Sequence, residues 1–344
     1  MNRFHAAVPL ARRHFLVASG AAALGAAGVP RLAFSASEFQ FKFANNLPPT
    51  HPMNLRAKEA AEKIAKESSG RAELLIFPSN QLGADADLLS QLRAGGIDLL
   101  TMSGLVASTL VPTAAITGMG FAFNDYPTVW QALDGKLGGY VRGELARANL
   151  LAMPRIWDNG FRQMTSSTRP IKSVDDLKGM KLRVPVSPLW TSMFKALGAA
   201  PAGIAPPELY SALQTGIVDG QENSLVGIQF TKLYEVQKYC ALTNHLWDGY
   251  WMLANKRMFE KLPKDIQEIV QRNLDAAAVA QRADVERLSL RARAELEKSG
   301  LQFNEVDKDP FRERLRKNGF YAGWKAKLGK EAWDTLETAV GRTV

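Results

Sequence analysis

Arg183 is the residue of this chain whose type and position most directly suggest a chemical task. It lies in the KLRVP run of residues 181–185, at the end of a predicted strand. An arginine carries its charge on a planar fork of N–H donors that matches the two oxygens of a carboxylate, and the ends of strands are where α/β clefts bind ligands. On composition alone, however, an arginine exposed at a strand end is the commoner arrangement, so both interpretations stay open.

Residue types used in catalysis are scarce by comparison. Past residue 36 the chain has two histidines, His51 and His245, and one cysteine, Cys240, whose apolar surroundings favour an inert core thiol. Nucleophilic catalysis requires a serine or cysteine beside a base, and a zinc site requires closely spaced His and Cys ligands. The GMG run of residues 118–120 lacks the third glycine of a dinucleotide-binding loop. We therefore predict that the chain is not an enzyme and has no metal site or cofactor.

The elements that would position Arg183 follow a regular order. Alternating residues 39–43 predict a strand, residues 53–68 a helix, and residues 74–77 a buried strand. A helix around residues 88–92 and a strand over residues 97–102 come next. This β-α-β-α-β order is typical of an α/β fold with a parallel sheet and helices on its faces. Further strands are expected at 150–153, 162–166, 181–186, 218–223 and 241–243, and a helix at 208–215.

A long helix is predicted from Pro263 to Ser299. The 37 residues of this range contain no internal glycine or proline, and Gly300 follows them directly. At 1.5 Å per residue such a helix would be about 55 Å long, which exceeds one domain. We expect it to brace two domains, the alternative being a broken helix pair. The aromatic residues between positions 311 and 344 are expected to pack on the chain itself rather than on a partner.

Residues 1–37 have the features of a cleaved export signal. Arg12 and Arg13 precede a weakly apolar run over residues 15–24, and small residues around positions 33–37 follow. Paired arginines followed by Phe and Leu resemble the twin-arginine type, although Ala11 stands where Ser or Thr is usual, so a Sec signal is the alternative.

The charge of the chain argues against nucleic acid as a partner. Four of the 43 basic residues and none of the 34 acidic ones lie within residues 1–36, which leaves 39 basic residues and a net charge of +5 after cleavage. These basic residues are interleaved with acidic ones rather than gathered in a patch.

An ordered series of short motifs is similar to the DctP family, the periplasmic binding components of tripartite ATP-independent periplasmic (TRAP) transporters. The resemblance covers nearly all of the chain beyond the export signal, at the expected spacing. The motifs are His51-Pro52, Ser69–Arg71, Phe77-Pro78, Gln81–Gly83, Gly96–Asp98, Phe121–Phe123, Asn159–Gln163, Arg169–Ile171, Asp175–Gly179, Lys181–Pro185, Leu197–Ala199 before Pro201, Glu208–Gly216, Val218–Asn223, Tyr234–Tyr239 and Thr243–His245.

The resemblance implies a two-lobed periplasmic-binding-protein (type II-like) fold with a ligand cleft between the lobes. It implies lobe I over residues 38–160 plus about 249–288, and lobe II over 161–248 plus about 289–344. The implied function is capture of a small organic acid in the periplasm and its delivery to TRAP membrane subunits, by a protein that is usually a monomer. A carboxylate-binding sensor or scavenger is the alternative.

The resemblance also implies which residues touch the ligand. Arg183 occupies the position whose arginine pairs with the carboxylate, while Arg162 and Asn223 occupy positions that face the cleft. Ser224 departs from the usual proline after Asn223, so the local turn is open to question. Some members of the family place a cation beside the ligand, and Glu222 is the residue that could bind such a cation here.

Softer assignments come from the same comparison, and for several a capping or turn role is equally plausible. They are Asn45, Asn46, Asp85, Ser103, and Pro206 at a position where some members have an aromatic ring. The residues that could supply a ring instead are Trp157, Trp190, Trp247 and Tyr250, with Trp247 preferred.

Overall fold

The computed structural model describes residues 37–341. The export signal predicted for residues 1–37 therefore lies, apart from Ser37, outside the described residues. Within residues 37–341, no helix is both long enough and apolar enough to cross a bilayer.

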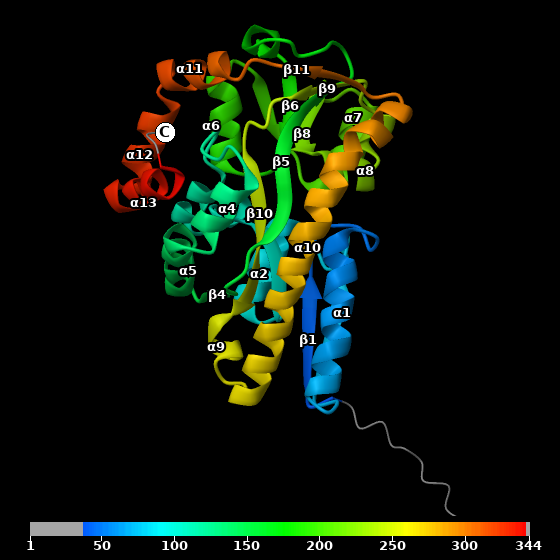
Figure 1. The fold of residues 1–344 in the computed structure, drawn as a ribbon, viewed down its shortest axis with the longest axis vertical. Coiled ribbons are helices and arrows are strands. Elements are labelled where there is room, and N and C mark those ends of the chain that lie inside the picture. The colour runs from blue at the N-terminus through cyan, green and yellow to red at the C-terminus, as the bar shows by residue number, and fades with distance from the viewer. Residues whose placement is uncertain (1–36, 342–344) are drawn as a thin grey trace, which may run out of the picture. The chain divides into compact units, whose positions relative to one another are not determined.

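An 11-stranded sheet runs through these residues, with eight strands in the order β2-β1-β3-β10-β5-β8-β6-β7 (Figure 1). The strands are β1 (Phe39–Ala44), β2 (Ala72–Phe77), β3 (Leu99–Ser103), β4 (Leu150–Ala152), β5 (Trp157–Ser166), β6 (Lys181–Val184), β7 (Ala200–Gly203), β8 (Gly220–Ser224), β9 (Tyr239–Leu242), β10 (Trp247–Asn255) and β11 (Gln302–Glu305). Strands β1, β2 and β3 pair in parallel in one half of the sheet, and β6, β7 and β8 do so in the other.

Two strands cross between the halves. The first residues of β5 pair with β10 and its later residues with β8 and β9, whereas β10 pairs with β5 at its start and with β3 and β4 at its end. All these pairings are antiparallel. The molecule is thus an α/β protein of two lobes, with β5 and β10 as the shared strands, as predicted.

Helices cover the faces of both halves. The α-helices are α1 (Pro52–Glu67), α2 (Asp85–Ala94), α3 (Gly104–Ala107), α4 (Tyr126–Leu133), α5 (Lys136–Arg147), α6 (Pro188–Ala196), α7 (Pro206–Gln214), α8 (Leu225–Phe230), α9 (Lys256–Phe259), α10 (Lys264–Lys298), α11 (Asp309–Lys317), α12 (Phe320–Leu328) and α13 (Lys330–Val340). Short 3-10 helices span Pro112–Gly118, Val174–Leu177 and Leu233–Glu235.

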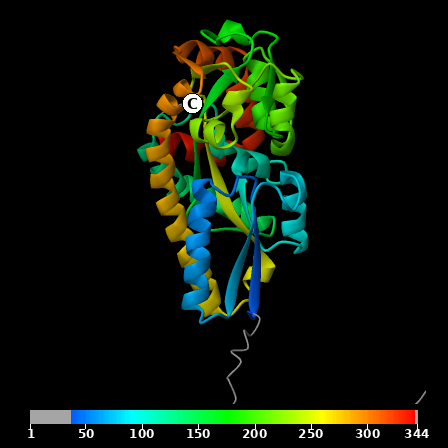
Figure 2. The same cartoon turned by 90° about the vertical axis from the view of Figure 1, so that its right-hand side faces the viewer.

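Helix α10 is the predicted brace. It runs unbroken for 35 residues and passes along both halves of the sheet (Figures 1 and 2). Its N-terminal part buries Ile266, Val270 and Leu274 in the core around α1 and β1, and its C-terminal part buries Ala292 and Leu296 in the core around α7 and β9. The buried apolar residues recur at helical spacing, so one face packs along the helix, while the exposed face is mostly polar apart from Val279 and Leu290.

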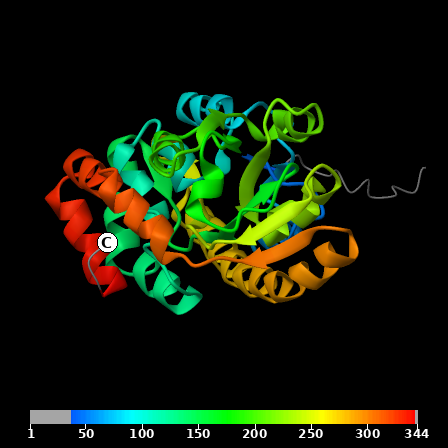
Figure 3. The same ribbon diagram turned by 90° about the horizontal axis from the view of Figure 1, so that it is seen from above.

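The C-terminal helices pack on the chain itself, as expected. The side chains of Phe311, Phe320, Trp324 and Trp333 are buried in the same core as residues of α4, α5 and α6. Figure 3 shows α11 to α13 lying along one side of the molecule, and α13 contacts both α4 and α5. Burial of this aromatic surface anchors the end of the chain.

A buried carboxyl group lies beneath the crossing strands. Asp158 Oδ1 accepts hydrogen bonds from the Gly160 amide and from Trp247 Nε1, each at 2.8 Å, and the Tyr126 hydroxyl also interacts with this carboxyl group. Burial, only partly opposed by these hydrogen bonds, raises the pKa of Asp158 to about 7.

The raised pKa of Asp158 predicts a pH-dependent stability. Because the unfolded carboxyl has a pKa near 4, the free energy of unfolding should fall as pH rises between about 4 and 7. Asp158→Asn keeps the Oδ1 acceptor and removes this titration. Relative to wild type, the variant should gain about 2 kcal/mol between pH 5.5 and 7.5, at ~1.4 kcal/mol per pH unit between the two pKa values. Urea unfolding at both pH values measures this, and parallel pH profiles would contradict it.

Candidate functional site

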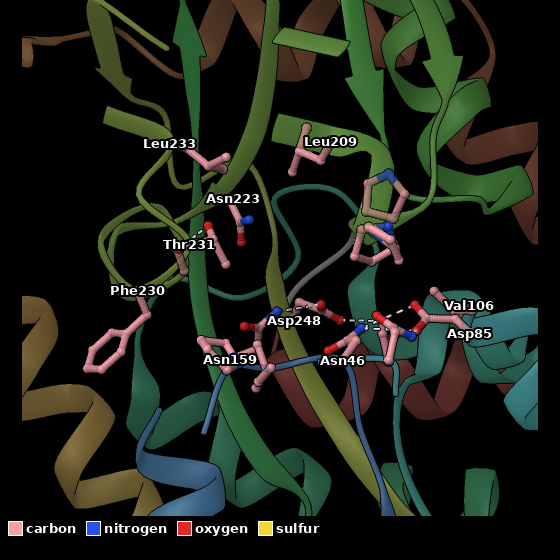
Figure 4. Close-up of a pocket in the computed structure, with 18 of the residues that line it drawn as sticks. Asn46, Asp85, Val106, Asn159, Leu209, Asn223, Phe230, Thr231, Leu233 and Asp248 are labelled. Carbon is pink, nitrogen blue, oxygen red and sulfur yellow. Dashed lines mark hydrogen bonds between the residues drawn. The ribbon is translucent and has the colours of Figure 1, made fainter. Parts of the chain in front are cut away.

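The two halves of the sheet enclose a cavity of about 250 Å³. Both crossing strands, the ends of β3 and β6 and the first turns of α2 and α7 contribute to its lining (Figure 4). Of the residues predicted to touch a ligand, seven line it: Asn46, Asp85, Ser103, Arg162, Arg183, Pro206 and Asn223.

Arg183 is a buried cation without an anion. Its side chain is at the end of β6, which Pro185 helps to terminate because proline has no N–H to continue the ladder. The residue is 1% exposed, its Nε donates to the Ile204 carbonyl at 2.8 Å, and its Nη2 has no hydrogen-bond partner among residues 37–341. Burial lowers the pKa of Arg183 to about 10, even though Glu222 opposes the shift. A desolvated guanidinium with an unused donor favours an anion that arrives with a ligand.

Arg162 has a carboxylate partner within the chain. The Glu222 carboxylate accepts two hydrogen bonds from it, from Nε to Oε2 at 2.5 Å and from Nη2 to Oε1 at 2.7 Å, and the Glu222 carbonyl accepts a third from Nη2 at 2.7 Å. The guanidinium also lies 5.1 Å from the ring centre of Trp190, and its Nη1 is 3.6 Å from Asp248 Oδ2. Arg162 thus lines the cavity as part of a neutralised pair, which makes it a weaker anchor for a second anion than Arg183.

Glu222 is held from its other side by His245. The two side chains meet at 3.1 Å between His245 Nε2 and Glu222 Oε2, and the second ring nitrogen of His245 contacts the Thr243 hydroxyl at 2.8 Å. Burial lowers the pKa of His245, so the ring is neutral and its Nε2–H donates to the carboxylate. Burial alone would raise the pKa of Glu222, but Arg162 and His245 outweigh it and lower the pKa to about 2. Since Glu222 already has these partners, it offers little to a cation, and residues 37–341 contain no group of three metal-ligating side chains.

Two carboxylates line the cavity, Asp85 and Asp248, and each is fixed by side-chain donors. Asp85 accepts hydrogen bonds from Asn46 Nδ2 at 3.1 and 3.2 Å and from Asn80 Nδ2 at 3.1 Å. Asp248 accepts one from the Ser103 hydroxyl at 2.6 Å and one from Asn159 Nδ2 at 2.9 Å. Burial raises the pKa of both carboxyl groups, against the opposing effect of these donors and of the nearby arginines.

Asn223 faces the same cavity from the end of β8. Its Oδ1 accepts a hydrogen bond from the Ser224 amide at 3.0 Å, an arrangement that the Ser at position 224 permits because a proline would have no N–H to donate. The Nδ2 group of Asn223 makes no hydrogen bond within residues 37–341. Because Asn223 lines the cavity, this group can donate to a ligand oxygen.

Two sequence-based assignments require correction. Asn45 is fully buried and exchanges side-chain hydrogen bonds with Asn54, so its amide supports the first turn of α1 rather than the cavity. Trp247 is also fully buried, with its Nε1–H on Asp158 and its ring against Phe123 and Trp130. Successive side chains of a strand point to opposite faces of the sheet. Because Asp248 faces the cavity, the neighbouring Trp247 points to the other face of β10.

Several lining residues escaped the sequence analysis or were ranked below Trp247. Asn159 and Asp248 lie on the crossing strands, and the aromatic lining comes from Trp190, Tyr210, Phe230 and Tyr250. The spacing of Asp248 and Tyr250, two residues apart on one strand, places them on the same face and is the signal that could have identified them.

Comparisons with known proteins agree with this geometry. The family model for the bacterial extracellular solute-binding proteins, family 7 (DctP), matches residues 43–318. An uncharacterized protein of Sinorhizobium fredii is 32% identical over 302 residues, which are 88% of this chain and 56% of that protein. The C4-dicarboxylate-binding periplasmic protein DctP of Rhodobacter capsulatus is 32% identical over 260 residues, 75% of this chain and 77% of that protein.

Solved structures are similar over almost the whole described chain. The sugar acid binding protein DctPAm of Advenella mimigardefordensis, in complex with galactonate, superposes with a TM-score of 0.83 at 30% identity, covering 88% of this chain and 97% of that one. A TRAP periplasmic solute-binding protein of Sulfurospirillum deleyianum with bound succinate superposes with a TM-score of 0.81 at 26% identity, covering 88% of this chain and 98% of that one. The chain therefore belongs to the DctP family of bacterial extracellular solute-binding proteins and has the two-lobed fold of the TRAP periplasmic members.

Proposed function

We propose that this chain is the solute-binding component of a TRAP transporter, which captures a small organic carboxylate in the cavity between its lobes and passes it to the membrane subunits. The observation that carries the proposal is Arg183, a buried guanidinium that lines the cavity with an unused N–H donor. A carboxylate supplies both the negative charge and the hydrogen-bond acceptor that this group lacks. Asn223 adds a donor beside it.

The proposal includes how the lobes are divided and how they act. Lobe I comprises residues 38–160 plus about 249–288, and lobe II residues 161–248 plus about 289–344. A change of core along α10 supports a boundary within this helix, since its two ends are buried in different clusters. Closure of the lobes about β5 and β10 encloses the ligand, in the manner of hinged binding proteins.

Binding without turnover, by a monomer in the periplasm, completes the proposal. Among residues 37–341 the lining of the cavity has no cysteine or histidine, and its Arg162 is already paired with Glu222 and lies 3.6 Å from Asp248. A bound acid should therefore be recovered unchanged after prolonged incubation. Light scattering of the processed chain should give the mass of one copy.

A thermal-shift screen of the chain from residue 38 onward, against a panel of organic acids, tests the proposal. A carboxylate present at 100 times its dissociation constant should add ~2.7 kcal/mol to the free energy of unfolding and raise the melting temperature. The matching amides and neutral sugars should have no effect. Shifts with sugars, amines or metal ions in place of acids would contradict the carboxylate assignment.

A further inference from the structure

The relatives do not decide which acid this chain binds, because their names include both C4-dicarboxylates and galactonate. The side chains around the cavity differ in what they offer such ligands. Figure 4 shows Asn159, Asp248, Asn46 and Asp85 along one side of the cavity, facing Asn223 and Leu209 on the other. The carboxylates and amides on the side of Asp85 would interact differently with a dicarboxylate and with a hydroxylated monocarboxylate.

Among residues 37–341, the lining contains one cation that makes no ion pair. Arg162 and Arg183 are its two arginines, and the lining includes no lysine or histidine among residues 37–341. Glu222 already matches the charge of Arg162. A ligand carboxylate on Arg183 therefore uses the one unpaired positive charge, and a second ligand carboxylate would find none.

Asp85 is the complementary group: the charge of Arg183 acts on it, but no cation forms an ion pair with it among residues 37–341. Its hydrogen bonds come from two neutral amides. A carboxylate has about four lone-pair sites, so Asp85 can accept further donors. A hydroxyl group can donate to it, whereas a second ligand carboxylate has no hydrogen to donate and would be repelled by the ionised form of Asp85.

The neighbours of Asp85 also present acceptors. Asn46 and Asn80 turn their Nδ2 groups toward this carboxylate, and among residues 37–341 no hydrogen bond is made to the Oδ1 atom of either amide. Asn159 is oriented in the same way by Asp248. All three amides line the cavity, so this side offers oxygen acceptors to a ligand that carries several O–H donors.

We infer that the cavity selects a monocarboxylate with several hydroxyl groups, of the sugar-acid type, and that Asp85 is the specificity-determining residue that excludes dicarboxylates. The inference rests on the proposed function, in which Arg183 holds the carboxylate. The volume of the cavity, about 250 Å³, is smaller than the roughly 300–1,000 Å³ of pockets that bind drug-sized ligands. The ligand is therefore expected to be a small acid.

Three pairs of acids, each pair differing only in whether one terminal carbon is an alcohol or a carboxylate, test the inference by calorimetry. They are galactonate and galactarate, erythronate and meso-tartrate, and 4-hydroxybutyrate and succinate. The best-binding hydroxylated monocarboxylate should bind wild type at least tenfold more tightly than its dicarboxylate. Equal or tighter binding of the dicarboxylate, or no binding of any of the three monocarboxylates, would overturn the inference.

Asp85→Asn removes the negative charge with little change of shape. The variant should bind the preferred monocarboxylate at least tenfold more weakly and should lose most of the discrimination against its dicarboxylate. Asp87→Asn is the matched control, because Asp87 lies in the same first turn of α2, is exposed and does not line the cavity. An unchanged ratio in Asp85→Asn, with an unchanged melting temperature of the free protein, would also overturn the inference.

These outcomes separate the inference from the proposed function. If succinate, meso-tartrate or galactarate binds best and binding depends on Arg183, the function stands and the selectivity assigned to Asp85 is wrong. If no organic acid shifts the melting temperature in the wider panel, the proposed function itself fails.

Discussion

Replacing Arg183 with alanine is expected to weaken carboxylate binding by ~2–5 kcal/mol, or roughly 30-fold to several thousand-fold in the dissociation constant. The physical reason is that the ligand carboxylate would then be buried without the only unpaired cation in the cavity lining of residues 37–341. Isothermal titration with the acid found in the thermal-shift screen measures the loss.

The same substitution should leave the free protein nearly as stable as wild type. Arg183 is 1% exposed, and one of its donors is unsatisfied, so the folded state without ligand gains little from this charge. Arg183→Met, which keeps most of the volume, separates loss of charge from loss of packing, and Arg93→Ala on the exposed side of α2 is the control. A loss of affinity below tenfold in both Arg183 variants would show that another group holds the carboxylate.

Replacing Glu222 with glutamine should destabilise the fold itself by ~3–5 kcal/mol. Arg162 is 3% exposed, and without Glu222 its nearest carboxylate would be Asp248 at 3.6 Å. The neutral side chain would also turn an amide toward donors of Arg162 and His245. Urea unfolding of the free protein at neutral pH measures the lost free energy, in contrast to the binding defect expected for Arg183.

A surface ion pair supplies the control for Glu222. Glu305 pairs with Arg293 at 2.9 Å but is 71% exposed, so Glu305→Gln should cost at most about 1 kcal/mol. Because the pKa of Glu222 is lowered from 4.5 to about 2, its contribution should be complete above about pH 5 and lost as the pH falls toward 2. A Glu222→Gln variant as stable as wild type at pH 7 would refute the structural role of this pair.

The sequence was sufficient for features that depend on local pattern. The alternation of residues 39–43 gives a strand, because Phe41 and Phe43 face the core while Gln40 and Lys42 do not. The range without glycine or proline gives α10, since nothing in it interrupts the helical hydrogen bonds. The motif around Arg183 ends a strand as expected, although β6 ends at Val184 and not at residue 186.

Strand β10 shows where local pattern was insufficient. Every residue from Trp247 to Asn255 is buried, so the strand has no alternation of polar and apolar side chains to reveal it. It also has a change of register at Asp248 and Gly249, opposite β5. Which of Trp247 and Asp248 faces the cavity depends on that pairing, and a shift of one residue exchanges the two faces.

The contrast between Asn45 and Asn46 has the same origin. Both follow β1, and composition does not distinguish them, but one amide closes onto Asn54 of α1 while the other reaches Asp85 of α2. Those partners lie 9 and 39 residues away along the chain. The sequence by itself therefore determined the β-α-β-α-β order over residues 39–102, the bracing helix and the arginine for a carboxylate. Only the tertiary structure decided which neighbouring side chains line the cavity, because that choice is made by contacts between distant segments.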